Sequence, residues 1–363
     1  MHHLLCVHGI GTHANNWTDS IDDGDISFNN LLKELWEHYF PDDSFDSKVK
    51  VHSIHYDDEI KMLFNNWEEQ AKALKSGLAS SHLLLDEIDW FTEIIDSASA
   101  TADEEHDDHW KYSHLMDLLL FVGSPTIQKR LVTYVGAQVA KFIAENFEDN
   151  QISVIGHSMG TAILHKVIKA YFNEGFVDEA GKRHTASHNF MFNSVIMVAN
   201  TSYTLSRDKG AHYEGIARPS LTPGKGSAYQ WFNINHQFDP VGQFLPFNPK
   251  GTTWLDPSIK AIEWFKDIEL ELITSKSIHS INHYFRDPAF HIPFFNTVFA
   301  KNITKEKINE AVKSHATISI QGGFAELRSG FLALSSKNAN SFKDFYQNLI
   351  AFQNLIENFK DTE

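Results

Sequence analysis

The sequence predicts an α/β fold in which a mostly parallel β-sheet is covered by helices on both faces. Short apolar segments, each typical of a buried strand, occur at residues 4–7, 152–155 and 194–198. Segments whose apolar residues recur with helical spacing lie between them. Because the chain has 363 residues and no visible repeat period, we expect a single domain over residues 1–363.

The first third of the chain supplies two of these strands and a long helical segment. After the strand at residues 4–7, residues 28–40 carry apolar side chains on one helical face, and residues 49–56 predict a second strand. Residues 60–124 contain no confident strand, and their apolar residues have helical spacing. We therefore interpret residues 60–124 as a helical cap inserted into the domain. Its acidic part, residues 86–109, contains neither Lys nor Arg.

The remainder of the chain continues the alternation of strands and helices. Helices are expected at residues 125–146, 159–172, 258–266, 305–313 and 341–359. Strands are expected at residues 152–155, 194–198, 231–236 and 268–274. Residues 176–188 and 202–227 are rich in polar and turn-forming residues and are interpreted as loops.

Composition and charge exclude several classes of protein. The chain has 47 acidic and 31 basic side chains, so a net charge of −16 argues against nucleic acid or anionic membranes as partners. The one cysteine, Cys6, excludes an internal disulfide scaffold. The longest apolar runs, such as residues 118–122, are too short to span a bilayer, and no signal peptide is visible. We therefore expect a cytoplasmic protein without a transmembrane segment.

The most informative motif is G-x-S-x-G at residues 156–160, directly between a predicted strand and a predicted helix. A nucleophile in this context lies on a tight turn, where bulky flanking side chains would collide. Gly156 and Gly160 relieve that crowding on the two sides of Ser158. The turn also presents the Ser158 hydroxyl at a helix N-terminus, which favours developing negative charge.

The chain resembles the α/β-hydrolase family, in particular its lipase and esterase branch, over most of residues 1–295. The resemblance rests on the G-x-S-x-G motif, on the H-G-x-G segment at residues 8–12, and on the triad residues described below. It implies an oxyanion hole formed by the backbone N–H groups of Ile10 and Met159. The chain begins on the strand before the H-G-x-G segment, so we expect a sheet without the family's usual two leading strands.

A nucleotide-binding interpretation competes for part of the same segment. Residues 9–14 also fit the pattern G-x-G-x-x-G/A, but that fingerprint needs a helix starting inside it and an acid about 20 residues further on. Here loop-forming residues follow, and the next strand ends near Asp57.

Residues 103–109 look metal-binding but lack a pattern such as H-E-x-x-H, so a solvated acidic loop is favoured. We expect no cofactor and no catalytic metal.

The acid of a Ser-acid-His triad should follow Ser158 in the chain. Asp239 is the best candidate because it follows a strand and precedes Pro240, in a D-P-V turn of the kind that carries the family's acid. Asp208 and Asp256 are alternatives in less favourable loops.

Two histidines compete for the role of base. His279 and His283 both follow the strand at residues 268–274. Alignment of Tyr284 and Pro288 with the family's terminal histidine loop favours His279, and His283 remains the alternative. His236, on the strand before the acid, is interpreted as structural.

These residues predict a serine hydrolase that cleaves carboxylic esters through an acyl-enzyme, with a small-molecule ester as substrate. Phenylalanines at residues 244–247 and 290–299 could line an apolar acyl pocket or belong to the core. The insertion at residues 60–124 could cover the site as a lid that selects neutral esters. A catalytically silent binding module and an acyltransferase with the same triad are the alternatives.

Overall fold

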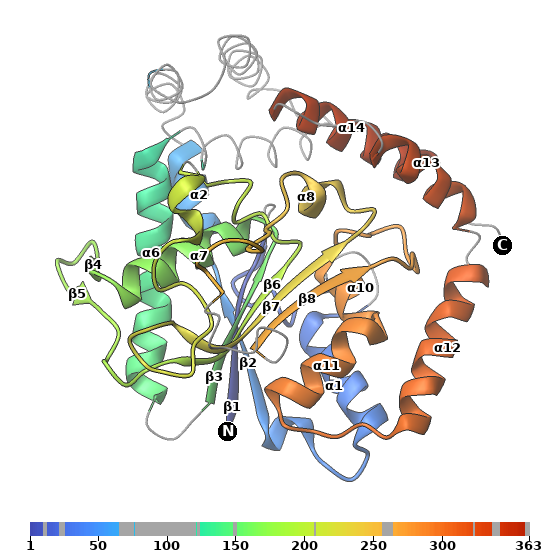
Figure 1. Ribbon diagram of the computed structural model, residues 1–363, viewed down its shortest axis with the longest axis horizontal. Helices are drawn as coiled ribbons and strands as arrows, with labels where there is room; N and C mark the ends of the chain where they lie inside the picture. The colour runs from blue at the N-terminus through green and yellow to red at the C-terminus, as the bar shows by residue number, and fades with distance from the viewer. Residues whose placement is uncertain are drawn as a thin grey trace.

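The computed structural model describes residues 1–9, 13–21, 26–64, 76, 121, 124–147, 151–206, 208–255, 264–321, 324–335 and 342–359. Its centre is a six-stranded sheet with the order β2-β1-β3-β6-β7-β8, in which every neighbouring pair is parallel (Figure 1). The strands are β1 (His2–Val7), β2 (Val49–Ile54), β3 (Gln151–His157), β6 (Phe192–Val198), β7 (Ala228–His236) and β8 (Phe265–Leu270). A separate two-stranded hairpin consists of β4 (Phe176–Val177) and β5 (Arg183–His184).

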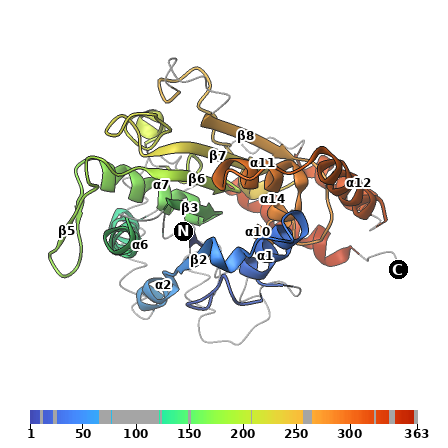
Figure 2. The ribbon, with the colours of Figure 1, turned by 90° about the horizontal axis from the view of Figure 1, so that it is seen from below.

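Helices cover both faces of the sheet. Alternate strand residues point to opposite sides, and both sets are apolar, so each face needs a helical layer to bury it. In β1, Leu5 and Val7 pack into a core with α6 (Pro125–Asn146) and α7 (Met159–Phe172). Leu4 and Cys6 pack into a second core on the other face. That core contains α1 (Phe28–Tyr39), α10 (Ile281–Arg286) and α11 (Pro288–Val298), as Figure 2 shows. This arrangement buries both faces of the central strands, which explains why they are apolar throughout.

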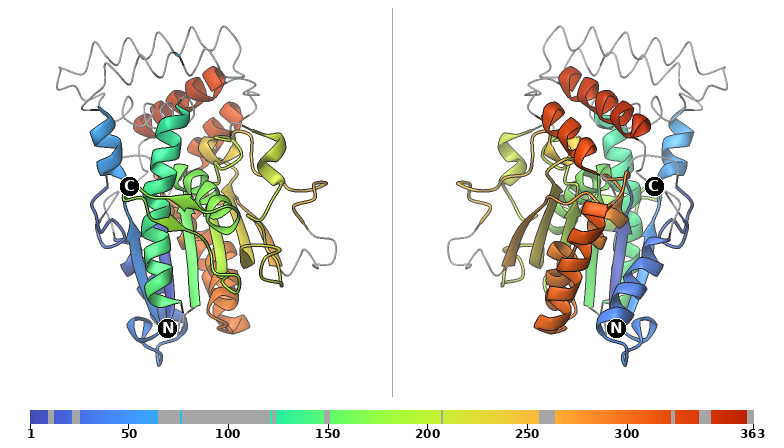
Figure 3. Two further views of the ribbon diagram at one scale, coloured as in Figure 1. Left: turned by 90° about the vertical axis from the view of Figure 1, so that its left-hand side faces the viewer. Right: turned by 90° about the vertical axis from the view of Figure 1, so that its right-hand side faces the viewer.

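The other helices that the structure describes lie at the edges of this layered body. They are α2 (Asp57–Phe64), α8 (Pro240–Gln243), α12 (Lys305–Gln321), α13 (Ala325–Ser335) and α14 (Phe342–Asn358), with short 3₁₀ turns at Phe45–Ser47 and Gly210–Tyr213. Helices α13 and α14 lie beyond the carboxyl edge of the sheet (Figure 3). There they form a third hydrophobic cluster, in which Phe324, Leu327, Phe331 and Phe352 of the two helices and of the residue before α13 pack with residues of the loops after β7 and β8, namely Phe238, Ile273 and Ile278.

Most elements of the parallel sheet and its helical layers agree with the sequence predictions, and the predicted α/β class is confirmed. One strand was placed wrongly: the structure has β8 at Phe265–Leu270, whereas the sequence predicted residues 268–274. The predicted helix at residues 258–266 is therefore wrong at its end, and residues 258–263 lie outside the described residues. Pairing with β7, from Trp231 opposite Phe265 to His236 opposite Leu270, determines where this edge strand lies.

Smaller differences concern the loops and the C-terminal region. The loop predicted at residues 176–188 contains the β4–β5 hairpin, and the predicted helix at residues 305–313 continues to Gln321. Of the predicted insertion at residues 60–124, the structure describes residues 60–64, 76, 121 and 124, so its lid role falls outside the described residues. None of the helices in the described part of the chain combines the length and apolar character needed to cross a bilayer.

Candidate active site

The candidate site lies at the carboxyl edge of the sheet, between β1 and β3. From β1 the chain moves to β2 on one side and later returns to β3 on the other side. Such a reversal of strand order leaves a crevice beyond the carboxyl ends of the two strands, where ligands of open α/β sheets usually bind. Gly9 follows β1 and Ser158 follows β3, so both lie at this point.

Ser158 occupies a sharp turn between β3 and α7. Its φ of 54° and ψ of −129° lie outside the regions that side chains other than glycine normally adopt. The turn brings α7 so close to β1 that a Cβ atom at Gly160 would lie 2.3 Å from the His8 carbonyl oxygen and 2.5 Å from that of Val7. A Cβ atom at Gly156 would lie 3.0 Å from the Thr161 Cα. Both glycines of the motif are therefore required by close backbone approach.

Hydrogen bonds hold this strained turn on both sides. The Ser158 N–H donates to the Val198 carbonyl at 3.0 Å, which ties the turn to β6. The Ser158 carbonyl accepts from the Thr161 N–H at 2.9 Å, from the Thr161 hydroxyl at 2.6 Å and from the Thr201 hydroxyl at 2.8 Å. Three donors on one carbonyl leave the turn little freedom, so the direction of the Ser158 side chain is set by its surroundings.

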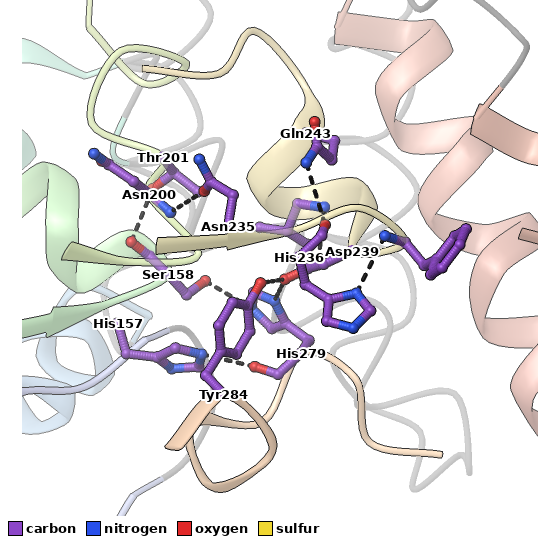
Figure 4. A network of polar contacts seen from close by, with 12 residues as sticks. His157, Ser158, Asn200, Thr201, Asn235, His236, Asp239, Gln243, His279 and Tyr284 are labelled. Atoms are coloured by element: carbon purple, nitrogen blue, oxygen red, sulfur yellow. Dashed lines mark hydrogen bonds and ion pairs between the residues drawn. The ribbon is translucent and has the colours of Figure 1, made fainter. Parts of the chain in front are cut away.

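The structure brings Ser158, His279 and Asp239 into one hydrogen-bonded chain (Figure 4). The His279 Nε2 lies 2.9 Å from the Ser158 Oγ, and the His279 Nδ1 lies 2.7 Å from the Asp239 Oδ2. Asp239 is fully buried, whereas the His279 side chain remains 28% exposed. An imidazole held by a carboxylate at one nitrogen and by a serine hydroxyl at the other can take up the hydroxyl proton.

Two further donors fix the carboxylate of Asp239. The Tyr284 hydroxyl donates to Oδ2 at 2.6 Å, and the Val241 N–H donates to Oδ1 at 2.9 Å. Burial on its own would raise the pKa of Asp239, but the nearby His279 imidazole and these hydrogen bonds lower it below its ordinary value. Burial and the adjacent carboxylate raise the pKa of Tyr284 well above its ordinary value, so its hydroxyl stays a donor. Asp239 is thus an ionised acceptor with a fixed orientation.

His157, the residue before Ser158, contacts the base loop from another direction. Its Nε2 lies 2.7 Å from the His279 carbonyl oxygen, and because a carbonyl only accepts, the His157 Nε2–H donates. Burial and the neighbouring His279 lower the pKa of His157 to about 3, so its ring is neutral near pH 7. Sequence analysis missed this residue. Its position next to Ser158 was the available signal, but the partner lies 122 residues away.

The alternative base and the alternative acids lie elsewhere. The His283 Nδ1 lies 3.2 Å from the Ser275 Oγ, and its buried ring neighbours His236 rather than Ser158. His236 itself is buried, with its Nε2 at 3.2 Å from the Leu272 carbonyl. Asp208 accepts a hydrogen bond from the Ala211 N–H within its own turn. Asp256 lies outside the described residues.

Of the two predicted oxyanion donors, the structure describes Met159. As the first residue of α7, its N–H has no intrahelical acceptor and lies directly beside Ser158. Ile10 lies outside the described residues. The phenylalanines considered for an acyl pocket belong to the two core clusters on the faces of the sheet: Phe244, Phe247, Phe290, Phe294, Phe295 and Phe299. The core interpretation of these side chains is therefore the correct one.

No protein-family model and no curated protein sequence matches this chain. The interpretation of the site consequently depends on its own geometry and on the motifs in the sequence.

Among the described residues, one group has ligand atoms close enough together to hold a metal ion, namely His8, His55 and Asp57. The segment singled out from the sequence, residues 103–109, lies outside the described residues. This group was missed in the sequence because His8 lies 47 residues before His55 in the chain, although His55 and Asp57 are only two residues apart. The available signal was positional, since both segments follow neighbouring parallel strands, β1 and β2.

Proposed function

We propose that this protein is a serine hydrolase of the α/β-hydrolase type that cleaves carboxylic esters of small molecules. The observation that carries the proposal is the chain of contacts from the Ser158 Oγ to the His279 Nε2 at 2.9 Å and from the His279 Nδ1 to Asp239 at 2.7 Å. A strand–turn–helix around Ser158 and the order Ser, Asp, His along the chain also support it.

In the proposed reaction, the Ser158 Oγ attacks the ester carbonyl carbon while the His279 Nε2 takes the hydroxyl proton. The tetrahedral intermediate then expels the alcohol, which receives that proton from His279, and an acyl-enzyme remains on Ser158. A water molecule, deprotonated by His279, attacks the acyl carbon. The bond between that carbon and the Ser158 Oγ then breaks, His279 returns the proton to Ser158, and the carboxylic acid is released. Asp239 stays ionised throughout and orients the imidazole, for which its lowered pKa suits it.

The negative charge on the intermediate requires hydrogen-bond donors near Ser158. The N–H of Met159 at the start of α7 is suited to this role, because the helix N-terminus also carries partial positive charge. The family resemblance implies the N–H of Ile10 as the second donor. The neighbouring Gly9 supports this placement, because its backbone lies so close to Ser158 that an added Cβ atom would be 2.8 Å from the Ser158 Cβ.

A fluorophosphonate probe tests the proposal directly, because it reacts with activated serine hydroxyls and not with ordinary ones. We expect one adduct per chain, located on Ser158 by peptide mass spectrometry, and hydrolysis of nitrophenyl esters in a chain-length series. Ser158→Ala should remove both, with a loss of turnover on the order of 10⁶-fold. Ser47→Ala is the matched control, because Ser47 is exposed in a 3₁₀ turn.

Absence of any adduct and of any ester hydrolysis in the folded wild-type protein would favour a catalytically silent module. A Ser158→Ala variant that keeps a tenth of the wild-type rate would show that another residue is the nucleophile. Products in which the acyl group passes to an added alcohol faster than to water would indicate an acyltransferase with the same triad.

A further inference from the structure

A second group of functional side chains lies next to the candidate active site and takes no part in it. His8 follows β1, while His55 and Asp57 follow β2, and these strands pair in parallel with Val7 opposite Ile54. All three residues are buried, with exposed fractions of 1%, 8% and 3%. Buried imidazole and carboxylate groups that converge on one point are typical of a metal site.

The distances between the ligand atoms fit a tetrahedral ion. The His8 Nε2 lies 3.4 Å from the Asp57 Oδ1, and the His55 Nε2 lies 3.7 Å from the Asp57 Oδ2. Zinc binds nitrogen and oxygen at roughly 2.0–2.1 Å, so two ligand atoms of a tetrahedral site lie about 3.4 Å apart. The His8 nitrogen already has this separation from Oδ1, whereas the His55 distance is measured to Oδ2. Binding through one carboxylate oxygen therefore requires small side-chain rotations, starting from ligand atoms that all lie within 4.8 Å of one another.

The surroundings of His8 select the nitrogen that faces Asp57. The His8 Nδ1 lies 2.8 Å from the Gly9 carbonyl oxygen, so the proton is on Nδ1 and the lone pair is on Nε2. A histidine that binds a metal commonly donates its other N–H to a backbone carbonyl in this way. The ring also stacks on Tyr56, with centroids 4.0 Å apart and planes at 12°. Its orientation toward Asp57 is therefore fixed before any ion binds.

Binding would exchange two hydrogen bonds for metal–nitrogen bonds. The Tyr56 N–H lies 3.3 Å from the His8 Nε2, and the His55 Nε2 lies 3.0 Å from the His13 carbonyl. The first is long and weak. For the second, the proton moves from Nε2 to Nδ1 of His55, where the Asp58 carboxylate lies 3.9 Å away. The imidazole remains neutral, so this exchange neither releases nor consumes a proton.

We propose that His8, His55 and Asp57 form a binding site for a divalent transition-metal ion, with zinc as the best match. Two imidazoles and one carboxylate suit zinc better than magnesium or calcium, which prefer oxygen ligands. Three protein ligands leave the fourth tetrahedral position to water. This inference depends on the contacts of His8, His55 and Asp57 and not on the proposed ester hydrolysis.

The ion would fasten the segment after β1 to the segment after β2. That attachment bears on Ser158, because Gly9 follows His8 and lies against the turn, with 2.8 Å between an added Cβ and the Ser158 Cβ. The Tyr56 hydroxyl already joins the two segments by donating to the carbonyls of His8 and Gly9, at 3.0 and 2.6 Å. The proposed role of the ion is therefore structural, and it does not touch the reacting atoms.

The test measures bound metal and thermal stability on the full chain, so that it does not depend on activity. The protein is treated with a chelator, reloaded with Zn²⁺, washed and analysed for zinc content by mass spectrometry. We expect one zinc per chain and a higher melting temperature in the reloaded sample. His55→Ala and Asp57→Asn should each weaken zinc binding by at least about 100-fold, since even loss of an outer-shell partner costs 10–100-fold.

His52→Ala is the matched control, because His52 lies on β2 shortly before His55 and pairs with His3, outside this group. It should retain zinc binding. Circular dichroism of the metal-free variants separates loss of a ligand from loss of the fold, and His55→Gln serves as a milder variant if His55→Ala does not fold. The proposal is overturned if the wild-type chain retains no zinc, or if His55→Gln and Asp57→Asn bind it as tightly as the wild type.

Discussion

Gly160→Ala should change the stability of the protein through two opposing effects, a gain in helix propensity and a steric clash with the backbone. Alanine is favoured over glycine by about 0.8–1.0 kcal/mol in the interior of a helix, and Gly160 is the second residue of α7, so this value is the upper bound of the gain that propensity predicts. The added Cβ, however, would lie 2.3 Å from the His8 carbonyl oxygen and 2.5 Å from the Val7 carbonyl oxygen. Both contacts are with backbone atoms, of the last residue of β1 and of the residue that follows it, and β1 is a central strand paired on both sides, so this backbone cannot move aside as a flexible side chain can.

Overpacking of this kind costs about 1–3 kcal/mol and occasionally more, and the absence of a yielding neighbour places Gly160→Ala at the upper end. After subtraction of a propensity gain of at most about 1 kcal/mol, we expect a net loss of about 2–3 kcal/mol in the free energy of unfolding. Because α7 must retreat from β1, Ser158 moves with it, and a displacement of about 1 Å can lower turnover by about 100-fold.

Urea unfolding followed by circular dichroism measures the first effect, and ester hydrolysis measures the second. Gly210→Ala is the control, since the nearest atom to an added Cβ there is the Asp208 Oδ1 at 3.5 Å, and it should change stability little. A Gly160→Ala protein that is as stable as the wild type, or more stable, would refute the close approach of α7 to β1.

Three further predictions concern the contacts around Ser158. His279→Ala should reduce ester hydrolysis as severely as loss of the nucleophile, and His283→Ala should be milder; the reverse order in kcat/KM would identify His283 as the base. Tyr284→Phe removes a donor to the ionised Asp239 and should cost about 1.5–3 kcal/mol of stability near pH 7. That bond favours the ionised carboxylate, whose pKa is lowered in the fold, so the defect should be complete above the ordinary Asp pKa of about 4 and should shrink as the pH falls below that value toward the lowered pKa of Asp239. Urea titrations at several pH values measure it, and a pH-independent defect would contradict the assignment. Thr201→Val removes one of three donors to the Ser158 carbonyl and should cost about 1 kcal/mol, measured in the same titrations, with an unchanged midpoint counting against a role for this bond.

The sequence predicted the centre of the sheet better than its edge, for a physical reason. β3 and β6 are buried on both faces and therefore read as continuous apolar runs. Among the described strands β8 pairs with β7 alone, and its polar Lys266 and Asp267 obscured the beginning of the strand, so the prediction began at Ile268 and ran on into the residues beyond Leu270. A local sequence pattern is sufficient to locate a strand that is buried on both faces, whereas an edge strand can be located only when the strand that it pairs with is known.

The same distinction applies to the candidate site. The turn around Ser158 was predictable because its glycines and its nucleophile lie within five residues of each other. The donor from His157 to the His279 carbonyl, and the convergence of His8 with Asp57, were not predictable in this way. Each joins segments whose distance in space depends on strand order and register, which no short motif encodes.

The third hydrophobic cluster has a consequence for how the protein is made. Phe238 precedes Asp239, Ile278 precedes His279, and both side chains pack against α13 and α14 in residues 324–352. Since a ribosome releases the chain from its N-terminus onward, the sheet and the Ser158 turn can assemble while these helices are still inside the exit tunnel. The loops that carry Asp239 and His279 then lack their hydrophobic support. The complete set of contacts around Ser158, Asp239 and His279 therefore forms only after residues 324–352 have emerged from the ribosome, later than the Ser158 turn itself.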